Sequence, residues 1–259
     1  MAWSYLPPPT RTGWRRWLFP VAVVLLIPLL ALARRQVATW QSTTTLFEQA
    51  LRIDPRNDLA HYSLGMQKER QGLTNEAAAH FVTTLNINSN YYEAHLALGN
   101  IAGAAGDFET AARHFAAVLR LAPRNLDAWL NLGMAAREAG DLDLTEHAYD
   151  QALRIAPDNP DVHYFSGILR IRRGQLDLAR AAFEQAVALH PAFADGWNSL
   201  GKVAYLEGRF SDALTLHQKA IVLDPRVPEF HLNRGLAHER LGEDGPALQA
   251  FARAANLNP

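Results

Sequence analysis

The side chains in this sequence that could do chemistry are histidines, carboxylates and one glycine-containing stretch, because the 259-residue chain has no cysteine. Without cysteine there can be no disulfide, thiolate metal ligand or cysteine nucleophile. The stretch from Gly196 to Val203 reads GWNSLGKV and approaches a phosphate-binding loop. It lacks the closing Ser or Thr and follows no predicted strand, so we reject that reading. The sequence contains no H-E-x-x-H or G-x-S-x-G motif and no paired carboxylates in a plausible cleft.

Four histidines occupy equivalent positions separated by 34 residues or a multiple of 34: His61, His95, His163 and His231. Neighbouring helices pack about 8–10 Å apart, whereas zinc ligands lie about 2 Å from one metal ion. We therefore interpret these histidines as amphipathic packing residues. The sequence predicts no enzymatic activity, no cofactor and no metal site.

The composition favours a helical protein that does not bind nucleic acid. The net charge of −1 gives no electrostatic reason to expect nucleic-acid binding. Hydrophobic residues make up 49% of the chain, which is enough for a sizeable core. Alanine, leucine and arginine are abundant, and they favour helix over strand.

Three series of residues repeat with a period of 34, and this repetition decides the fold. The first series is Gly65, Gly99, Gly133, Gly167, Gly201 and Gly235. The second series is Gly72, Gly106, Gly140, Gly174, Gly208 and Gly242. The third series is Pro55, Pro123, Pro157, Pro191, Pro225 and Pro259, with Ser89 at its one interruption. A period of this length predicts a stack of two-helix units.

Each series has a physical role in the predicted unit. A glycine of the first series lies inside the first helix, as in AWLNLGMAA (128–136), and lets a neighbouring helix approach closely. A glycine of the second series ends that helix in the left-handed conformation, and the proline ends the second helix. We expect asparagines to cap the first helices: Asn57, Asn125 and Asn159. We expect the second helices to be capped at Asn75, Asp143, Asp177 and Ser211, and at Gly245-Pro246 in the last unit.

The repeats resemble the tetratricopeptide repeat (TPR), whose pattern is W-x2-L-G-x2-Y, A-x3-F and P. Trp129-Leu132-Gly133 and Trp197-Leu200-Gly201 carry the first part intact. Aromatic residues carry the second part in five units: Phe81, Phe115, Tyr149, Phe183 and Phe251. The pattern's tryptophan is histidine in four units, and its leucine is Ser166 in one unit and Arg234 in another. The resemblance implies an all-α, right-handed superhelical solenoid.

We divide the chain into four segments. A basic segment (1–16) precedes a predicted transmembrane helix with its juxtamembrane segment (17–40) and a leading half-repeat helix (41–57). Six TPR units then follow over 58–259, at 58–91, 92–125, 126–159, 160–193, 194–227 and 228–259. The sixth unit has no polar capping helix, which predicts that a partner or a second copy covers its outer face.

Residues 18–33 (LFPVAVVLLIPLLALA) carry no charge and are flanked by arginines on both sides. As a helix they cover roughly 24 Å, which is a little short of the hydrocarbon core, and including Trp17 reaches the low end of the spanning range. We favour a single transmembrane anchor over residues 17–33. A cleaved signal peptide ending at Ala33 and a buried soluble helix are the alternatives. The arginine distribution places the repeats on the non-cytoplasmic side, in the periplasm if the membrane is a bacterial inner membrane.

The junction between this segment and the repeats also resembles a known family. Arg34-Arg35, Trp40 and Leu46-Phe47 are similar to the passage from the last membrane helix to the repeats in TMTC-like membrane glycosyltransferases. The resemblance covers residues 15–55 and implies a substrate-engaging tail, because the catalytic acidic residues of that family lie in earlier loops that this chain does not have. An accessory or truncated TPR tail of such an enzyme is therefore the alternative function.

The TPR resemblance implies that the first helices line a concave groove for an extended peptide. Positions 2, 5, 9, 12 and 13 of each unit would face this groove, counted from the first residue of the unit. The predicted groove residues are Tyr62, Met66, Asn100, Arg137, Tyr164, Arg172, Lys202 and Tyr205. Their apolar and aromatic floor with scattered cations would suit a hydrophobic peptide with some acidic residues. The sequence thus predicts a membrane-anchored scaffold that binds a protein or peptide.

Overall fold

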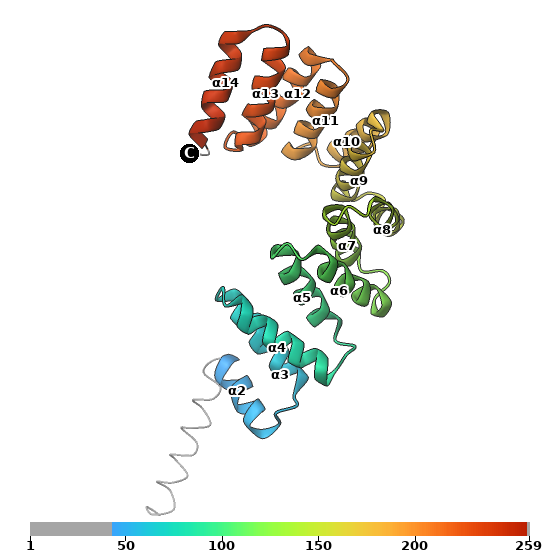
Figure 1. The fold of residues 1–259 in the computed structure, drawn as a ribbon, viewed down its shortest axis with the longest axis vertical. Coiled ribbons are helices and arrows are strands. Elements are labelled where there is room, and N and C mark those ends of the chain that lie inside the picture. Colours follow the sequence, from blue (N-terminus) through green and yellow to red (C-terminus); the bar gives the residue numbers. More distant parts are fainter. Residues whose placement is uncertain (1–42, 258–259) are drawn as a thin grey trace, which may run out of the picture. The chain divides into compact units, whose positions relative to one another are not determined.

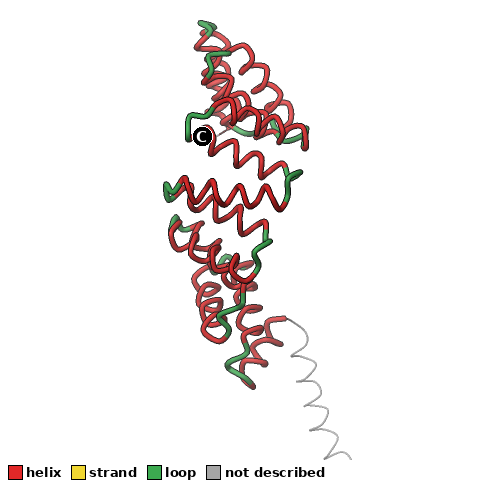
Figure 2. Tube along the Cα trace, turned by 90° about the vertical axis from the view of Figure 1, so that its right-hand side faces the viewer, coloured by secondary structure: helices red, strands yellow, loops and turns green. Residues whose placement is uncertain are grey.

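The computed structural model describes residues 43–257, and all regular structure in this range is helical (Figures 1 and 2). The half-repeat forms α2 (Thr43–Ile53). The first helices of the units are α3 (Asp58–Arg70), α5 (Tyr92–Ala104), α7 (Leu126–Glu138), α9 (Pro160–Arg172), α11 (Ala194–Leu206) and α13 (Pro228–Arg240). The second helices are α4 (Thr74–Ile87), α6 (Phe108–Leu121), α8 (Leu142–Ile155), α10 (Leu176–Leu189), α12 (Phe210–Leu223) and α14 (Asp244–Leu257).

The chain divides into two compact units after Tyr91. In the first unit, α3 packs against both α2 and α4. In the second unit, α5 to α14 pack in chain order, each helix against the next. The core of the second unit is a row of small clusters between successive helices, because each helix pair contacts only its neighbours in the stack.

The helix ends follow the two periodic series that predicted them. Six glycines from Gly72 to Gly242 have φ between 70° and 86°, so each takes the left-handed conformation after a first helix. Helices α6, α8, α10 and α12 end two residues before the periodic prolines Pro123, Pro157, Pro191 and Pro225. Both predictions are confirmed.

The glycines inside the first helices accept an aromatic ring from the second helix of the same unit. A Cβ atom built on Gly133 would lie 2.2 Å from Cε1 of Tyr149, and one on Gly167 would lie 2.6 Å from Cε1 of Phe183. The same contact joins Gly65, Gly99 and Gly235 to phenylalanines, and Gly201 to His217. The close approach predicted for this series is therefore confirmed, and its partner is a ring sixteen residues later.

The asparagine caps of the first helices are confirmed, whereas the predicted caps of the second helices are wrong by two residues. Asn125 Oδ1 accepts from the backbone N–H of Ala128 at 2.9 Å. Asn57 and Asn159 make the same bond. In the second helices the cap is the residue directly after the left-handed glycine, because that glycine already completes the turn; Asp141, for example, caps Leu144.

The residues that were expected as caps lie inside the second helices instead: Asn75, Asp143, Asp177 and Ser211. Asp143 and Asp177 are in the first turn, where a carboxylate favours the helix dipole. In the last unit α14 begins at Asp244, so Pro246 is its third residue and not its first.

Three of the four histidines that replace tryptophan also reproduce its hydrogen bond. Nε1 of Trp129 and of Trp197 donates to the carbonyl oxygen six residues earlier, at 2.9 Å in each case. Nε2 of His163 lies 2.7 Å from Pro157 O, and His61 and His231 make the equivalent contact. These three histidines therefore keep the contact of the tryptophan, which agrees with the predicted packing role.

The predicted basic segment 1–16 and the predicted transmembrane segment 17–40 lie outside the described residues. Between residues 43 and 257, no helix combines the length and the hydrophobicity that are needed to cross a membrane.

The glycine–ring contact generates a test. We expect Gly133→Ala to lower the free energy of unfolding by about 1–3 kcal/mol through overpacking, although alanine is the better helix former. The matched control is Gly103→Ala, whose Cβ would meet only Ala111 Cβ at 3.8 Å and which should stabilise by up to about 1 kcal/mol. Urea unfolding measures both changes, and an equal effect of the two substitutions would contradict the packing argument.

Candidate peptide-binding groove

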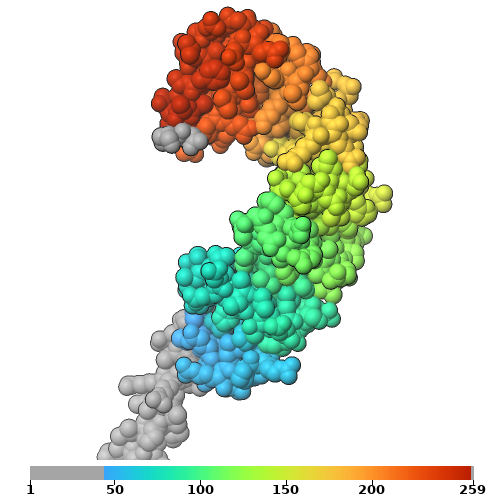
Figure 3. Space-filling model, in the orientation of Figure 1, coloured from blue at the N-terminus to red at the C-terminus, as the bar shows by residue number. Residues whose placement is uncertain are grey.

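The first helices of the second unit form one continuous surface. Helix α7 contacts both α5 and α9, and α11 contacts both α9 and α13. Among the described helices, the second helices make no comparable contact with one another, so the first helices line the shorter, inner side of the stack. Figure 3 shows the corresponding hollow on one side of the second unit, between α5 and α14.

One depression of this surface lies between α5 and α7 and has a volume of about 300 Å³. Its floor is apolar, with Phe108, Phe115 and Met134 among its lining residues. Asn131 Nδ2 donates to Asn100 Oδ1 at 3.2 Å across the two helices. The depression therefore presents amide groups above an apolar floor, which suits a peptide backbone with an apolar side chain.

Arg137, which lines this depression, shares one carboxylate with Arg172 of the next first helix. Arg137 lies 2.8 Å from Glu138 Oε1, and Arg172 lies 3.6 Å from the same oxygen. Arg172 also donates to the backbone carbonyl oxygen of Arg137 at 3.3 Å. Their positive charge is thus partly neutralised within the groove, so an acidic ligand would have to compete with Glu138.

A second depression, of about 220 Å³, lies where α9, α11 and α13 meet. Apolar side chains form most of its wall: Ile171, Leu206 and Leu236. Polar atoms come from Lys202, Tyr205, Asn233 and His217.

A buried polar network supports the second depression. Asn198 is 3% exposed, and its Oδ1 accepts from Asn233 Nδ2 at 3.0 Å. The same oxygen lies 2.9 Å from Nδ1 of His217, which is 1% exposed, so this nitrogen carries the proton. Glu229 forms an ion pair with Lys202 and lies 3.5 Å from Asn198 Nδ2. The network fixes the amide of Asn233 at the mouth of the depression.

The environment of this network shifts several pKa values. Burial lowers the pKa of His217 to about 4, so the ring is neutral at pH 7. The hydrogen bond from Lys202 lowers the pKa of Glu229 and keeps it ionised. Burial, followed by the nearby Glu229, raises the pKa of Asp195. Burial raises the pKa of Tyr164, which therefore keeps its hydroxyl proton.

The structure divides the eight predicted groove residues between the two compact units. Tyr62 and Met66 lie on α3 in the first unit, where Tyr62 packs its ring 5.7 Å from that of Phe81. In the second unit, Asn100 and Arg137 line the depression between α5 and α7. Lys202 and Tyr205 line the second depression, whereas Tyr164 and Arg172 lie on α9 and line neither. Their role in binding stays a prediction.

The sequence reasoning missed His217 and the partnership of Glu229 with Lys202. A signal for His217 was present, because it is the only interruption of the aromatic series. Asn198 lies nineteen residues earlier in the same unit, at a position that is Tyr or Leu in the other five units. The repeat pattern thus changes at two positions that touch. Glu229 also lies in the first turn of α13, where the helix dipole favours a carboxylate.

Two histidine pairs occur at the nineteen-residue separation that also joins Asn198 to His217. Nδ1 of His61 lies 3.2 Å from Nδ1 of His80, and the corresponding atoms of His95 and His114 are 3.0 Å apart. Burial, followed by the charge of the partner histidine, lowers the pKa of His80 and of His114. Within residues 43–257, no group of three or more His, Cys, Asp or Glu side chains is arranged to hold a metal ion.

Comparison with known families agrees with this geometry. The tetratricopeptide-repeat model matches residues 96–160, 166–228 and 207–259, which together exceed half of the sequence, and the chain belongs to this family. No curated protein matched the sequence.

Several solved structures share the fold. The chain is similar to PilW, described as a widely conserved type IV pilus biogenesis factor, with 20% identity over 77% of this chain and 92% of that one and a TM-score of 0.68. It is similar to MamA from Desulfovibrio magneticus RS-1, with 22% identity over 64% and 94% of the two chains and a TM-score of 0.56. It is also similar to YrrB, described as a TPR protein with an unusual peptide-binding site, with 20% identity over 70% and 94% and a TM-score of 0.52.

The burial of His217 predicts a loss of stability in acid. Its pKa is about 4 in the folded chain and about 6.5 when exposed, so the unfolded state takes up the proton first. The contribution is complete above pH 6.5 and falls by about 3 kcal/mol as the pH drops from 6.5 to 4. Urea unfolding at several pH values should show a shallower decline for His217→Phe, which restores the ring of the other repeats. An identical decline in the variant would contradict the assignment.

Proposed function

We propose that this protein is a membrane-anchored TPR scaffold whose groove binds an extended segment of a partner protein. The observation that carries the proposal is the pair of depressions along the first helices, each with an apolar wall and a fixed asparagine amide. Extended peptides need backbone hydrogen-bond partners and pockets for side chains, and both are present here.

The groove favours a mainly apolar segment. Its cations already have carboxylate partners, since Arg137 and Arg172 share Glu138, and Lys202 pairs with Glu229. An acidic ligand would gain less from these cations than their number suggests, because each pair must first be separated. We therefore assign the main recognition to apolar side chains and to the amides of Asn131 and Asn233.

The anchor is part of the same proposal. Residues 17–33 would hold the chain in a bacterial inner membrane, with the repeats on the periplasmic side. The support is the uncharged stretch with its flanking arginines and tryptophans.

The TMTC-like junction favours a second candidate function. Residues 15–55 resemble the stem of a membrane glycosyltransferase, so the repeats would then present a protein substrate to a separate catalytic chain. Co-purification with a multi-span membrane protein and loss of glycan transfer on deletion of residues 58–259 are the expected results. Normal transfer without these residues would exclude this function.

The groove can be tested by site-specific photo-crosslinking in the cell. A photoreactive residue at position 206 (exposed, in the wall of the second depression) should capture a partner, whereas one at position 147 (exposed, on α8) should not. The double substitution Lys202→Ala and Tyr205→Ala should weaken the crosslink at 206 at least fivefold, because it removes two lining side chains. Equal crosslinking at 206 and 147, or no effect of the double substitution, would argue against the groove.

The anchor has its own test. Alkaline carbonate washing should leave the intact chain in the membrane fraction, and protease added to spheroplasts should digest the repeats. A soluble product with its N-terminus near Arg34 would show that the preceding residues are a cleaved signal peptide and not an anchor. Protection of the repeats from external protease would reverse the proposed orientation.

A further inference from the structure

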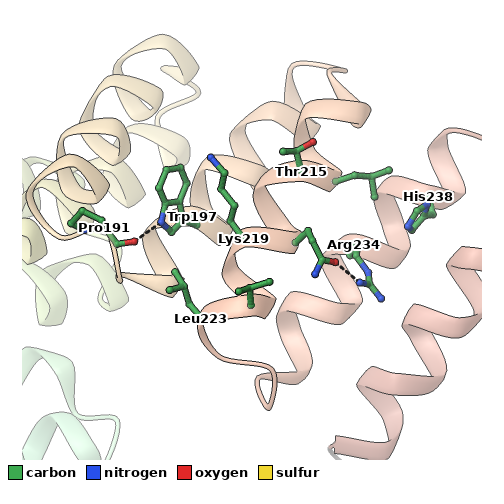
Figure 4. A pocket seen from close by; sticks show the side chains of 10 residues that line it. Pro191, Trp197, Thr215, Lys219, Leu223, Arg234 and His238 are labelled. Atoms are coloured by element: carbon green, nitrogen blue, oxygen red, sulfur yellow. Dashed lines mark hydrogen bonds between the residues drawn. The ribbon is translucent and has the colours of Figure 1, made fainter.

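A second hollow of the second unit lies outside the groove. It has a volume of about 710 Å³ and lies over α12, with Pro191 and Trp197 at one end and Arg234 and His238 at the other (Figure 4). Six of its ten lining residues belong to α12, a second helix: Leu214, Thr215, Gln218, Lys219, Val222 and Leu223. The hollow therefore lies on the second-helix side of the stack, away from the first-helix surface of the groove.

Two departures from the repeat pattern meet in this hollow. Val222 is 72% exposed, at a position that is Asn or Arg in four of the other units and Ala in the fifth: Asn86, Arg120, Arg154, Ala188 and Asn256. Arg234 occupies a position that is a buried leucine in four units: Leu64, Leu98, Leu132 and Leu200. Val222 thus exposes an apolar side chain, and Arg234 places a cation where the other repeats bury leucine. Helix packing alone explains neither change.

The guanidinium of Arg234 is incompletely satisfied. One terminal N–H donates to the neutral amide oxygen of Gln218 at 2.7 Å, and the buried Nε has no partner. A buried donor without a partner is unfavourable, whereas leucine at this position has no such donor. A carboxylate on an incoming ligand would pair with the terminal nitrogens of the guanidinium, for which the hydrogen-bonded Gln218 supplies only one neutral acceptor.

The opposite end of the hollow offers an apolar wall and a second cation. Trp197 donates its indole N–H to Pro191 O, which holds the ring in place (Figure 4). Lys219 Nζ lies 4.3 Å from the centre of that ring. Within residues 43–257, neither Lys219 nor Arg234 has a carboxylate oxygen within 4.0 Å, whereas His238 at the rim is paired with Glu243 at 2.5 Å.

We propose that this outer hollow binds an acidic, leucine-rich segment of a partner protein, with a carboxylate on Arg234 and apolar side chains against Trp197 and Val222. The charge supports this occupant, since no lining residue is a carboxylate. A peptide fits better than a lipid surface because the hollow is recessed and Arg234 is oriented by Gln218. The surface is separate from the groove, so the protein would hold two segments at once.

The test uses fluorescence anisotropy with the full-length chain and a labelled nine-residue peptide of alternating leucine and glutamate. A second peptide with lysine in place of glutamate is the ligand control. Arg234→Leu and Val222→Asn restore residues that the other repeats carry, so both variants should fold normally. We expect saturable binding of the acidic peptide only, weakened at least about tenfold by Arg234→Leu and about threefold by Val222→Asn.

The double variant Lys202→Ala, Tyr205→Ala should leave this affinity unchanged, which separates the hollow from the groove. No saturable binding of the acidic peptide, equal binding of the lysine peptide, or full affinity of Arg234→Leu would each overturn the proposal. Loss of binding in the groove variant would show that the peptide binds in the groove and not in the outer hollow. Binding to phosphatidylglycerol vesicles that depends on Arg234, without peptide binding, would assign the surface to lipid instead.

Discussion

The whole stack depends on the contact between a glycine of each first helix and the ring that lies against it from the second helix. A Cβ on any of these six glycines would come within 2.2–2.6 Å of a ring atom, so the two helices can pack this closely only when the side chain is absent. The contact is repeated every 34 residues and leaves each helix pair with two apolar flanks. Those flanks are buried by the neighbouring units, which is why the fold extends by repetition.

Because this packing uses fixed positions, the remaining positions are free to vary, and function is expected there. The fifth unit shows that even the packing ring can change. His217 replaces the usual phenylalanine or tyrosine and still fills the space against Gly201, while its Nδ1–H reaches Asn198. The chain thereby gains a buried polar network without losing the helix contact, and that network holds Asn233 in the groove.

The two candidate surfaces differ in how their charges are satisfied. In the groove, Arg137 and Lys202 each have a carboxylate partner, so the surface behaves as polar and nearly neutral. In the outer hollow, Lys219 contacts an aromatic ring and Arg234 a neutral amide. A charged ligand gains most where a cation has no internal partner, because no existing pair must be broken. The two surfaces are therefore suited to ligands of different charge.

The sequence by itself determined the helical repeat, the left-handed glycines and the asparagine caps, because these depend on local backbone geometry that recurs with a fixed period. It placed the caps of the second helices two residues too late. The turn is already complete at the left-handed glycine, so the next residue is the cap, as Asp141 is for α8. Only the tertiary structure decided which groove cations are neutralised and that Val222 and Arg234 share one hollow. Such pairings join residues on different helices, and their distances depend on how the units stack.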